Sequence, residues 1–343
     1  NSNQTRVIDA IRFDAQANGV SFGRFPDGAS GFQELSSPTA SQPNTAPLTG
    51  DIVINEIMYH PISENSDDEY VELFNNGASV IDLGGWRFTD GIDFRIPSNT
   101  VITAGGYLVV ARNRTNLLAR YPDLALAPAL VVGDFDGNLN NNGERLALAR
   151  PELAITADPG QDPVTNIIYV VVDEVEYRDG GRWGKWSDGG GSSLELIEPR
   201  ADNRLGPNWA DSDETAKAPW TTLEHTGMVD NGLATADHLH VVALEEGEYL
   251  LDDVEVFPVG SGNRVANGTF ETGLTGWTAR GTHQRSSLVN SGFNSARSLH
   301  VRASSRGDHA ANQVRVPLTA APGGNTTIRA RVRWLRGWPE VLL

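Results

Sequence analysis

The sequence contains no cysteine among its 343 residues. This absence excludes disulfide bonds, thiolate catalysis and cysteine-ligated zinc sites. Positive charge is also scarce, because 27 Lys and Arg residues stand against 44 Asp and Glu residues and give a formal net charge of −17. Nucleic acids and anionic membrane surfaces require clustered Lys and Arg, so the composition argues against both as partners.

Long hydrophobic runs are missing as well. No apolar segment approaches the roughly 20 residues of a membrane helix, which argues against membrane insertion. The N-terminus NSNQTRVIDAIRF has no basic region followed by an apolar region, so it does not read as a signal peptide. The first residue is not Met, and both ends read as strands. We therefore expect a piece of a longer protein, in which the missing signal says nothing about secretion.

The motifs of common enzyme classes are absent too. No G-x-S-x-G occurs, and the Gly-rich run 189–193 is not followed by the Lys and helix of a phosphate loop. The oxygen-rich run 134–140 fails the EF-hand pattern, because Leu139 stands at its sixth position and Arg145 at its twelfth. No pair of acids stands out as a glycosidase pair. We expect no active site in this chain, and any catalytic domain would lie outside it.

What the sequence has is many short strands. Its 36 glycines and 18 prolines separate short β-branched and aromatic runs, which predicts an all-β fold. The run at 52–58 is apolar on both faces, whereas 70–74 alternates between polar and apolar residues. One helix is predicted over 113–121, with Asn113 or Thr115 as its N-cap and Pro122 at its end.

Residues 48–213 resemble a lamin tail domain, a family with an immunoglobulin-like β-sandwich. The resemblance rests on INEIMYHP, EYVELFNNGASVIDLGGWRFTDG, VITAGGYLVVAR, NNGERLALA, VVDEVEY and GSSLELIEPRADNRLGPNW, which follow in order over most of 51–209. It implies an exported, multi-domain bacterial protein, located outside the cell or on its surface.

Residues 1–47 echo part of that domain. The run Val7–Phe13 matches Val171–Tyr177, and each is followed by Gly-rich sequence with aromatic and basic residues and by an Asp-Gly turn. Two explanations stay open, namely a tandem repeat and a chance likeness of two β-rich segments. We favour the repeat, in which residues 1–47 are the C-terminal part of a preceding lamin-tail-like domain and a linker.

Residues 214–343 resemble the jelly-roll sandwiches of carbohydrate-binding modules with a galactose-binding-like fold. The sequences LLDDVEV, NRVANGTFETGLTGW and TTIRARVRW carry this resemblance, but the usual closing motif LLDDVEV comes before the usual opening motif ANGTFE. Either 214–257 is the tail of a separate module, or the jelly roll is circularly permuted. We favour permutation, with the module cut short at its C-terminus.

The resemblance to carbohydrate-binding modules also implies a structural Ca²⁺ site. It would be formed by Asp252 and Asp253 in the closing strand and by Glu271 and Asn267 in the opening one, because carboxylate and carbonyl oxygens suit this hard cation. A solvated pair of surface acids is the alternative reading.

Two tryptophans are candidate sugar contacts. Trp334 and Trp338 lie in the last domain, and exposed aromatic rings offer apolar faces for stacking. Trp86, Trp209 and Trp277 are expected in the cores instead.

The function that these expectations support is non-catalytic. We expect an adhesion, targeting or scaffold region whose partners are a polysaccharide or cell-surface glycan and other domains of the same chain. The alternative is an accessory region of an extracellular hydrolase or kinase-like enzyme.

Overall fold

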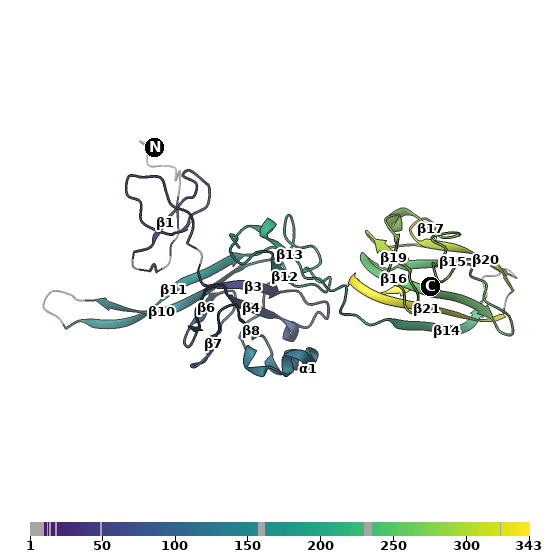
Figure 1. Ribbon diagram of the computed structural model, residues 1–343, viewed down its shortest axis with the longest axis horizontal. Coiled ribbons are helices and arrows are strands. Elements are labelled where there is room, and N and C mark those ends of the chain that lie inside the picture. Colours follow the sequence, from purple (N-terminus) through teal and green to yellow (C-terminus); the bar gives the residue numbers. More distant parts are fainter. Residues whose placement is uncertain are drawn as a thin grey trace. The chain divides into compact units, whose positions relative to one another are not determined.

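The computed structural model describes residues 10–11, 13, 15–17, 19–48, 50–156, 162–229, 235–322 and 324–343. The chain divides into two compact units, which are described one at a time (Figure 1). Unit 1 comprises Asn1–Asp188 and Ser193–Ser212, and unit 2 comprises Gly189–Ser192 and Asp213–Leu343. Both units consist mainly of β-strands, which confirms the predicted all-β fold class.

Unit 1 is organised around a six-stranded sheet with the strand order β13-β12-β3-β4-β8-β9. Its pairs are antiparallel except for the parallel pair β8–β9. The strands are β3 (Ile52–Met58), β4 (Tyr70–Asn75), β8 (Tyr107–Ala111), β9 (Val131–Gly133), β12 (Leu194–Leu196) and β13 (Trp209–Asp211). The side chains of β4 alternate between partly exposed and buried, as the sequence predicts for a strand with one face on a core.

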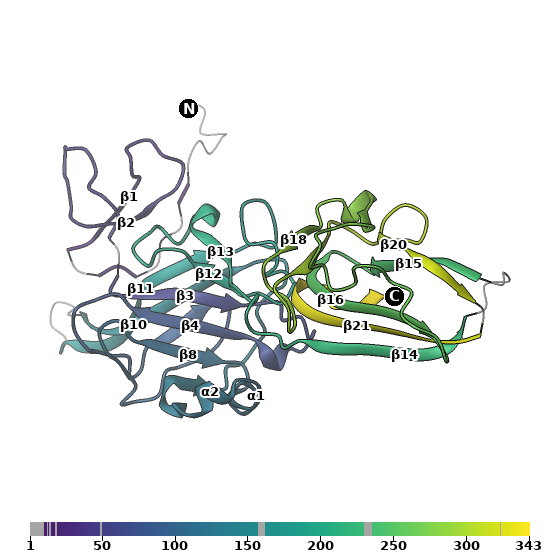
Figure 2. The ribbon, with the colours of Figure 1, turned by 45° about the vertical axis from the view of Figure 1, so that its right-hand side comes forward.

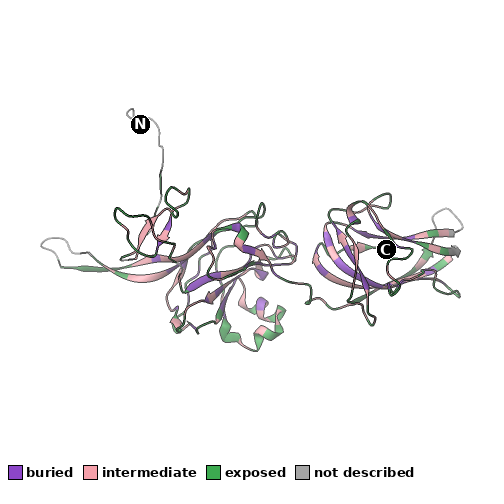
Figure 3. Cartoon of the chain, turned by 45° about the horizontal axis from the view of Figure 1, so that its top comes forward, coloured by how far each residue is buried: buried purple, intermediate pink, exposed green. Residues whose placement is uncertain are grey.

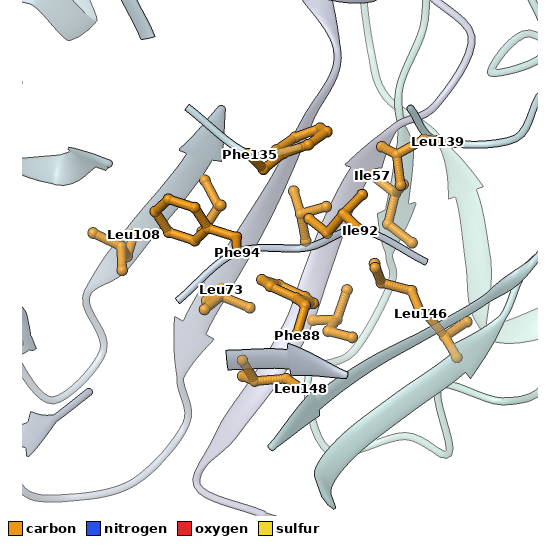
Figure 4. Close-up of a cluster of buried hydrophobic side chains, with 14 of the residues drawn as sticks. Ile57, Leu73, Phe88, Ile92, Phe94, Leu108, Phe135, Leu139, Leu146 and Leu148 are labelled. Atoms are coloured by element: carbon orange, nitrogen blue, oxygen red, sulfur yellow. The ribbon is translucent and has the colours of Figure 1, made fainter. Parts of the chain in front are cut away.

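A second, three-stranded sheet with the order β11-β10-β6 packs over the core of unit 1. It contains β6 (Arg87–Asp90), β10 (Arg145–Thr156) and β11 (Val164–Glu176), and a small sheet pairs β5 (Ile81–Asp82) with β7 (Val101–Ile102). Figure 4 shows Phe88, Leu146 and Leu148 meeting Ile57 and Leu73 from the larger sheet. This contact between two sheets is the core of a β-sandwich.

Two short helices cover part of the outer face of the larger sheet (Figure 2). They are α1 (Arg114–Arg120) and α2 (Pro122–Ala125). The side chain of Asn113 accepts a hydrogen bond from the backbone N–H of Asn116, which confirms the predicted cap. Pro122 follows the end of α1 and opens α2 as its first residue. Leu117 packs against the sheet there. Unit 1 also contains the 3-10 helices Ser66–Asp68, Pro128–Leu130 and Gly206–Asn208.

The N-terminal part of unit 1 contains a small hairpin of β1 (Ser21–Gly23) and β2 (Gln33–Leu35). Leu35 is buried, and the Phe22 and Phe32 rings stack with centroids 6.1 Å apart. Most of the run Val7–Phe13, which echoes Val171–Tyr177, lies outside the described residues. The tandem repeat that depends on it therefore stays a prediction.

Unit 2 is a sandwich of a five-stranded sheet, β14-β21-β16-β19-β18, and a four-stranded sheet, β17-β20-β15-β22. All of its strand pairs are antiparallel. The five-stranded sheet contains β14 (Thr221–Val229), β16 (Gly247–Pro258), β18 (Ser287–Val289), β19 (Ser298–Ala303) and β21 (Gly324–Gly337). The four-stranded sheet contains β15 (Thr235–Ala243), β17 (Thr278–Ala279), β20 (Val314–Pro322) and β22 (Val341–Leu342), and a 3-10 helix spans Gly281–His283.

The two halves of unit 2 share one core. Strand β16 lies between β21 and β19, and β15 pairs with β20 and β22. Buried side chains such as Leu251, Val301 and Val316 form a single cluster between the sheets. Figure 3 colours the buried stretches of the strands purple. Residues 214–257 are therefore not the tail of a separate module, and that alternative is wrong. They supply strands to the same sandwich as residues 263–343.

The predicted opening strand of unit 2 is also wrong. Residues 263–277 form turns, with one isolated bridge between Val265 and Leu318. Asn267 and Phe270 have φ values of 54° and 57°, in the left-handed region that interrupts a strand. A Cβ at Gly268 would lie 2.1 Å from the carbonyl oxygen of Val254, so this segment packs directly on the backbone of β16. Glu271 consequently lies in a turn and not in a strand.

None of the helices in the described ranges has the length and hydrophobicity that crossing a membrane requires.

Candidate ligand-binding surfaces

Asp252 is the predicted calcium ligand that the structure places deepest. It lies at an irregularity of β16, and its side chain is fully buried. One carboxylate oxygen accepts hydrogen bonds from the backbone N–H of Phe293 and the hydroxyl of Ser295, both at 2.8 Å, and the other accepts from the N–H of Asp253. Burial raises the pKa of this carboxyl, and these hydrogen bonds oppose the rise. Asp252 thus fixes the segment 291–297 between β18 and β19.

Glu271 holds the other end of the same segment. Its carboxylate accepts a hydrogen bond of 2.8 Å from the backbone N–H of Arg297. Asn267 instead organises its own turn, because its amide donates to the carbonyls of Gly273 and Thr275. The resemblance to carbohydrate-binding modules implies that the closing and opening motifs lie side by side, and they do meet, since the N–H of Val254 donates to the carbonyl of Gly268 at 3.0 Å.

These contacts bear on the predicted calcium site. Within the described parts of the chain, no group of three or more His, Asp or Glu side chains is arranged to hold a metal ion. Asp252 and Glu271 use carboxylate oxygens to hold 291–297 through N–H and O–H donors, whereas Ca²⁺ requires six to eight oxygen ligands. Calcium binding by Asp252, Asp253, Glu271 and Asn267 therefore stays a prediction, and these residues do not form a cage of three acids.

The two predicted sugar contacts differ in exposure. Trp334 is half-buried on β21, and its indole N–H donates to the carbonyl of Gly337 at 2.9 Å. Trp338 is 45% exposed, and its indole N–H donates to Glu340 at 3.2 Å. Trp338 therefore offers an accessible ring at the end of the sandwich, whereas Trp334 is partly covered. Trp209 and Trp277 are buried as predicted, and Trp86 packs partly buried against the core of unit 1.

A group of side chains that the sequence analysis missed lies on the outer face of the five-stranded sheet. Ile328, Ala330 and Val332 of β21 face the core, so the alternating Arg329, Arg331 and Arg333 face outward. The Arg331 guanidinium lies 4.5 Å from the centroid of the Phe293 ring, and Trp220 meets that ring edge-on with centroids 6.0 Å apart. We call Trp220, Phe293 and Arg331 the aromatic–arginine cluster.

The position of this cluster follows from Asp252. The segment 291–297 has no strand of its own, and Asp252 fixes the backbone of Phe293 beside β21. In the register of β16 and β21, Asp252 stands directly opposite Arg331. All three members of the cluster are half-buried, so their rings and guanidinium remain partly open to solvent. A cation placed over a ring face in this way is a favourable contact.

Charged groups occupy the same sheet face next to the cluster. The Glu248 carboxylate lies 2.8 Å from Nε2 of His300 and 3.2 Å from the guanidinium of Arg336. Burial raises the pKa of Glu248, but the hydrogen bonds and charges of His300 and Arg336 outweigh it and give a net lowering. Arg329 pairs with Glu224 at 2.5 Å and with Glu255 at 3.4 Å. The face therefore carries an ordered set of hydrogen-bonding groups.

Unit 1 contains a cavity of about 630 Å³. Residues of β2, β11 and the segment 200–204 contribute to its lining. Arg204 crosses this region, because its guanidinium donates to the carbonyl of Phe32 and to the side chain of Gln33. Asp173 accepts hydrogen bonds of 2.7 Å from the N–H of Ile54 and the amide of Asn203, and burial raises its pKa to about 7. Many polar groups at this cavity thus hold neighbouring segments of unit 1 together.

Two further acids of unit 1 lie at partly or fully buried positions. Glu69 accepts a hydrogen bond of 2.8 Å from the N–H of Leu139, and burial raises its pKa to about 7. Glu72 of β4 stands directly across from Glu56 of β3, and Asn55 donates to its carboxylate at 2.9 Å. Burial and the Glu56 charge raise the pKa of Glu72 to about 7.

Comparison with known proteins identifies part of the chain. Residues 45–178 match the model of the Lamin Tail Domain family. No curated protein and no solved structure matches the sequence. The matched residues include β3 to β10 and all of β11, which are most of the two sheets of unit 1. This part of the chain is a lamin tail domain with an immunoglobulin-like fold, which indicates a structural or interaction module.

Proposed function

We propose that this chain is a non-catalytic adhesion or targeting region of an exported or cell-surface bacterial protein, and that unit 2 binds a polysaccharide through the aromatic–arginine cluster. The proposal rests on the observation that the Phe293 ring lies against both the Trp220 ring and the Arg331 guanidinium on the outer face of the five-stranded sheet. The lamin tail domain of unit 1 then serves as a scaffold and spacer.

The chemistry of the cluster supports a sugar ligand. Aromatic rings pack against flat apolar faces, such as the C–H face of a pyranose ring. The guanidinium of Arg331 presents several N–H donors that suit hydroxyl and carboxylate oxygens. Because Asp252 and Glu271 fix the segment that carries Phe293, the platform is held in place before a ligand arrives, which reduces the ordering cost of binding.

The proposal is tested by measuring the binding of the 343-residue protein to a glycan array. Trp220→Ala and Phe293→Ala should each weaken binding to any glycan captured by at least about tenfold, which corresponds to about 1.4 kcal/mol. Trp338→Ala is the matched control, because this tryptophan is exposed but lies outside the cluster. It should leave binding unchanged.

Two results would contradict the proposal. One is a protein that captures no glycan, and the other is a loss of binding in Trp338→Ala that is absent in the two cluster variants. Melting temperatures of each variant, measured alongside, separate loss of binding from loss of folding. Repeating the assay with added Ca²⁺ and with a chelator tests the predicted calcium site, since a structural ion would raise the melting temperature of unit 2.

A further inference from the structure

Strands β10 and β11 of unit 1 continue as a hairpin arm beyond β6, the strand that pairs with β10 at the base of the arm. Strand β6 pairs with residues 147–149 of β10 only, whereas β10 and β11 stay paired to Thr156 and Val164. Figure 1 shows these two strands projecting from the domain. We call residues 150–156 and 164–170 the arm. No third strand pairs with the arm in the described residues, so both of its edges present unpaired backbone groups.

One face of the arm is apolar and exposed. Directly opposite residues of an antiparallel pair lie on the same face, and the register places Leu153 opposite Ile167 and Pro151 opposite Tyr169. With a period of two, Ile155 shares this face. Leu153 is 72% exposed, Ile155 is 70% exposed and Ile167 is 58% exposed. Figure 3 colours the distal strands green and pink, in contrast to the purple core.

The same arm carries almost no charge. Its charged side chains are Arg150 and Glu152, which form an ion pair of 2.7 Å with each other. The whole chain has a formal net charge of −17, so two copies repel each other over most of their surface. Within the arm itself, a second copy meets only this ion pair. The acidic residues nearest to the arm in the sequence are Asp158 and Asp162, in the connection between its two strands. Natural proteins usually protect exposed strand edges with charged residues, and the arm lacks this protection.

We propose that the arm is a self-association site, at which two copies of this chain pack their apolar faces together. A hairpin suits this role because a twofold contact uses the same patch on both partners and therefore needs a self-complementary surface. The face around Leu153, Ile155 and Ile167 is such a surface, because each apolar side chain meets apolar side chains of the other copy. The contact leaves the lamin tail core of each copy intact.

The test measures the association state of the full chain by sedimentation velocity over a wide range of protein concentration. The wild-type protein should form a dimer, and Leu153→Glu should raise the dimer dissociation constant at least tenfold. Leu126→Glu is the matched control, because Leu126 is 84% exposed and lies outside the arm. It should dimerise like the wild type. A monomeric wild type, or an equal effect of both variants, would overturn the proposal.

Mixing two charged variants tests whether the apolar faces of the two arms contact each other. Leu153→Glu and Leu153→Lys should each stay monomeric alone and should form a heterodimer when mixed, because opposite charges then lie close together. Failure to form the heterodimer would overturn the face-to-face arrangement. Sedimentation with neutral phosphatidylcholine vesicles tests a membrane as the occupant instead. A wild-type protein that is monomeric and sediments with these vesicles would refute self-association.

Discussion

Replacing Glu72 by glutamine should stabilise unit 1 more at alkaline than at mildly acidic pH. Glu72 lies on the outer face of the six-stranded sheet, directly across from Glu56, which in turn stands opposite Glu195 of β12. Three carboxylates thus follow one another across neighbouring strands. Glu56 accepts hydrogen bonds from the hydroxyls of Tyr70 and Ser193, which hold it in place beside Glu72. Like charges directly opposite on a sheet are destabilising.

The magnitude follows from the pKa of Glu72. Burial and the Glu56 charge raise this pKa from 4.5 to about 7. Between these pH values the folded protein holds a proton that the unfolded chain has released, so stability falls as pH rises through this window. At 1.36 kcal/mol for each pKa unit, the loss reaches about 3 kcal/mol above pH 7. Glutamine at this position stays neutral and can keep the hydrogen bond from Asn55.

The assay is urea denaturation of both proteins at about pH 5.5 and about pH 8. Glu72→Gln should be more stable than the wild type at both, and its advantage should be about 2 kcal/mol larger at the higher pH. Glu176→Gln is the control, because Glu176 is exposed and pairs only at the surface with Arg178, so its effect should be small at both pH values. An advantage of Glu72→Gln that does not change with pH would refute the reasoning.

Two further predictions concern buried positions. Burial raises the pKa of Asp173 from 3.8 to about 7, so the stability of unit 1 should decline between about pH 4 and 7. Asp173→Asn, whose side-chain oxygen can still accept the hydrogen bond from Asn203, should make this decline smaller. An unchanged pH dependence in urea denaturation would contradict this. Gly268→Ala should destabilise unit 2 by about 3 kcal/mol or more, because the new Cβ would clash with the carbonyl oxygen of Val254. Gly262→Ala is the control, because no atom lies near the position of its Cβ, and thermal denaturation should show no change in its stability.

Local patterns predicted the parts of the fold that depend on neighbouring residues. The alternation of Tyr70–Phe74 gives β4, and the hydrogen-bonding side chain of Asn113 gives the start of α1. The resemblance to carbohydrate-binding modules, and not a local pattern, implied that LLDDVEV and ANGTFE lie side by side, and the contact between Val254 and Gly268 agrees with it. The predictions of β4 and of the start of α1 follow from hydrophobic alternation and from capping chemistry that acts over a few residues.

The aromatic–arginine cluster could not be predicted in the same way. Trp220 precedes β14, Phe293 lies in a turn segment, and Arg331 lies on β21. No spacing in the sequence relates these three positions. The alternation of Arg329, Arg331 and Arg333 was the one available signal, because it marks the outward face of β21. Phe293 covers that face because the Asp252 carboxylate, 41 residues away in the sequence, accepts a hydrogen bond from its backbone N–H.

Asp252 shows why a buried acid alone does not predict a metal. An acid next to apolar residues in a strand must be neutralised or must accept hydrogen bonds, and calcium or N–H donors can both satisfy it. Here the donors are the N–H of Phe293 and the hydroxyl of Ser295. A cation that displaced them would release the segment that carries Phe293. Calcium coordination by Asp252 that replaced these hydrogen bonds would therefore disorder the aromatic–arginine cluster.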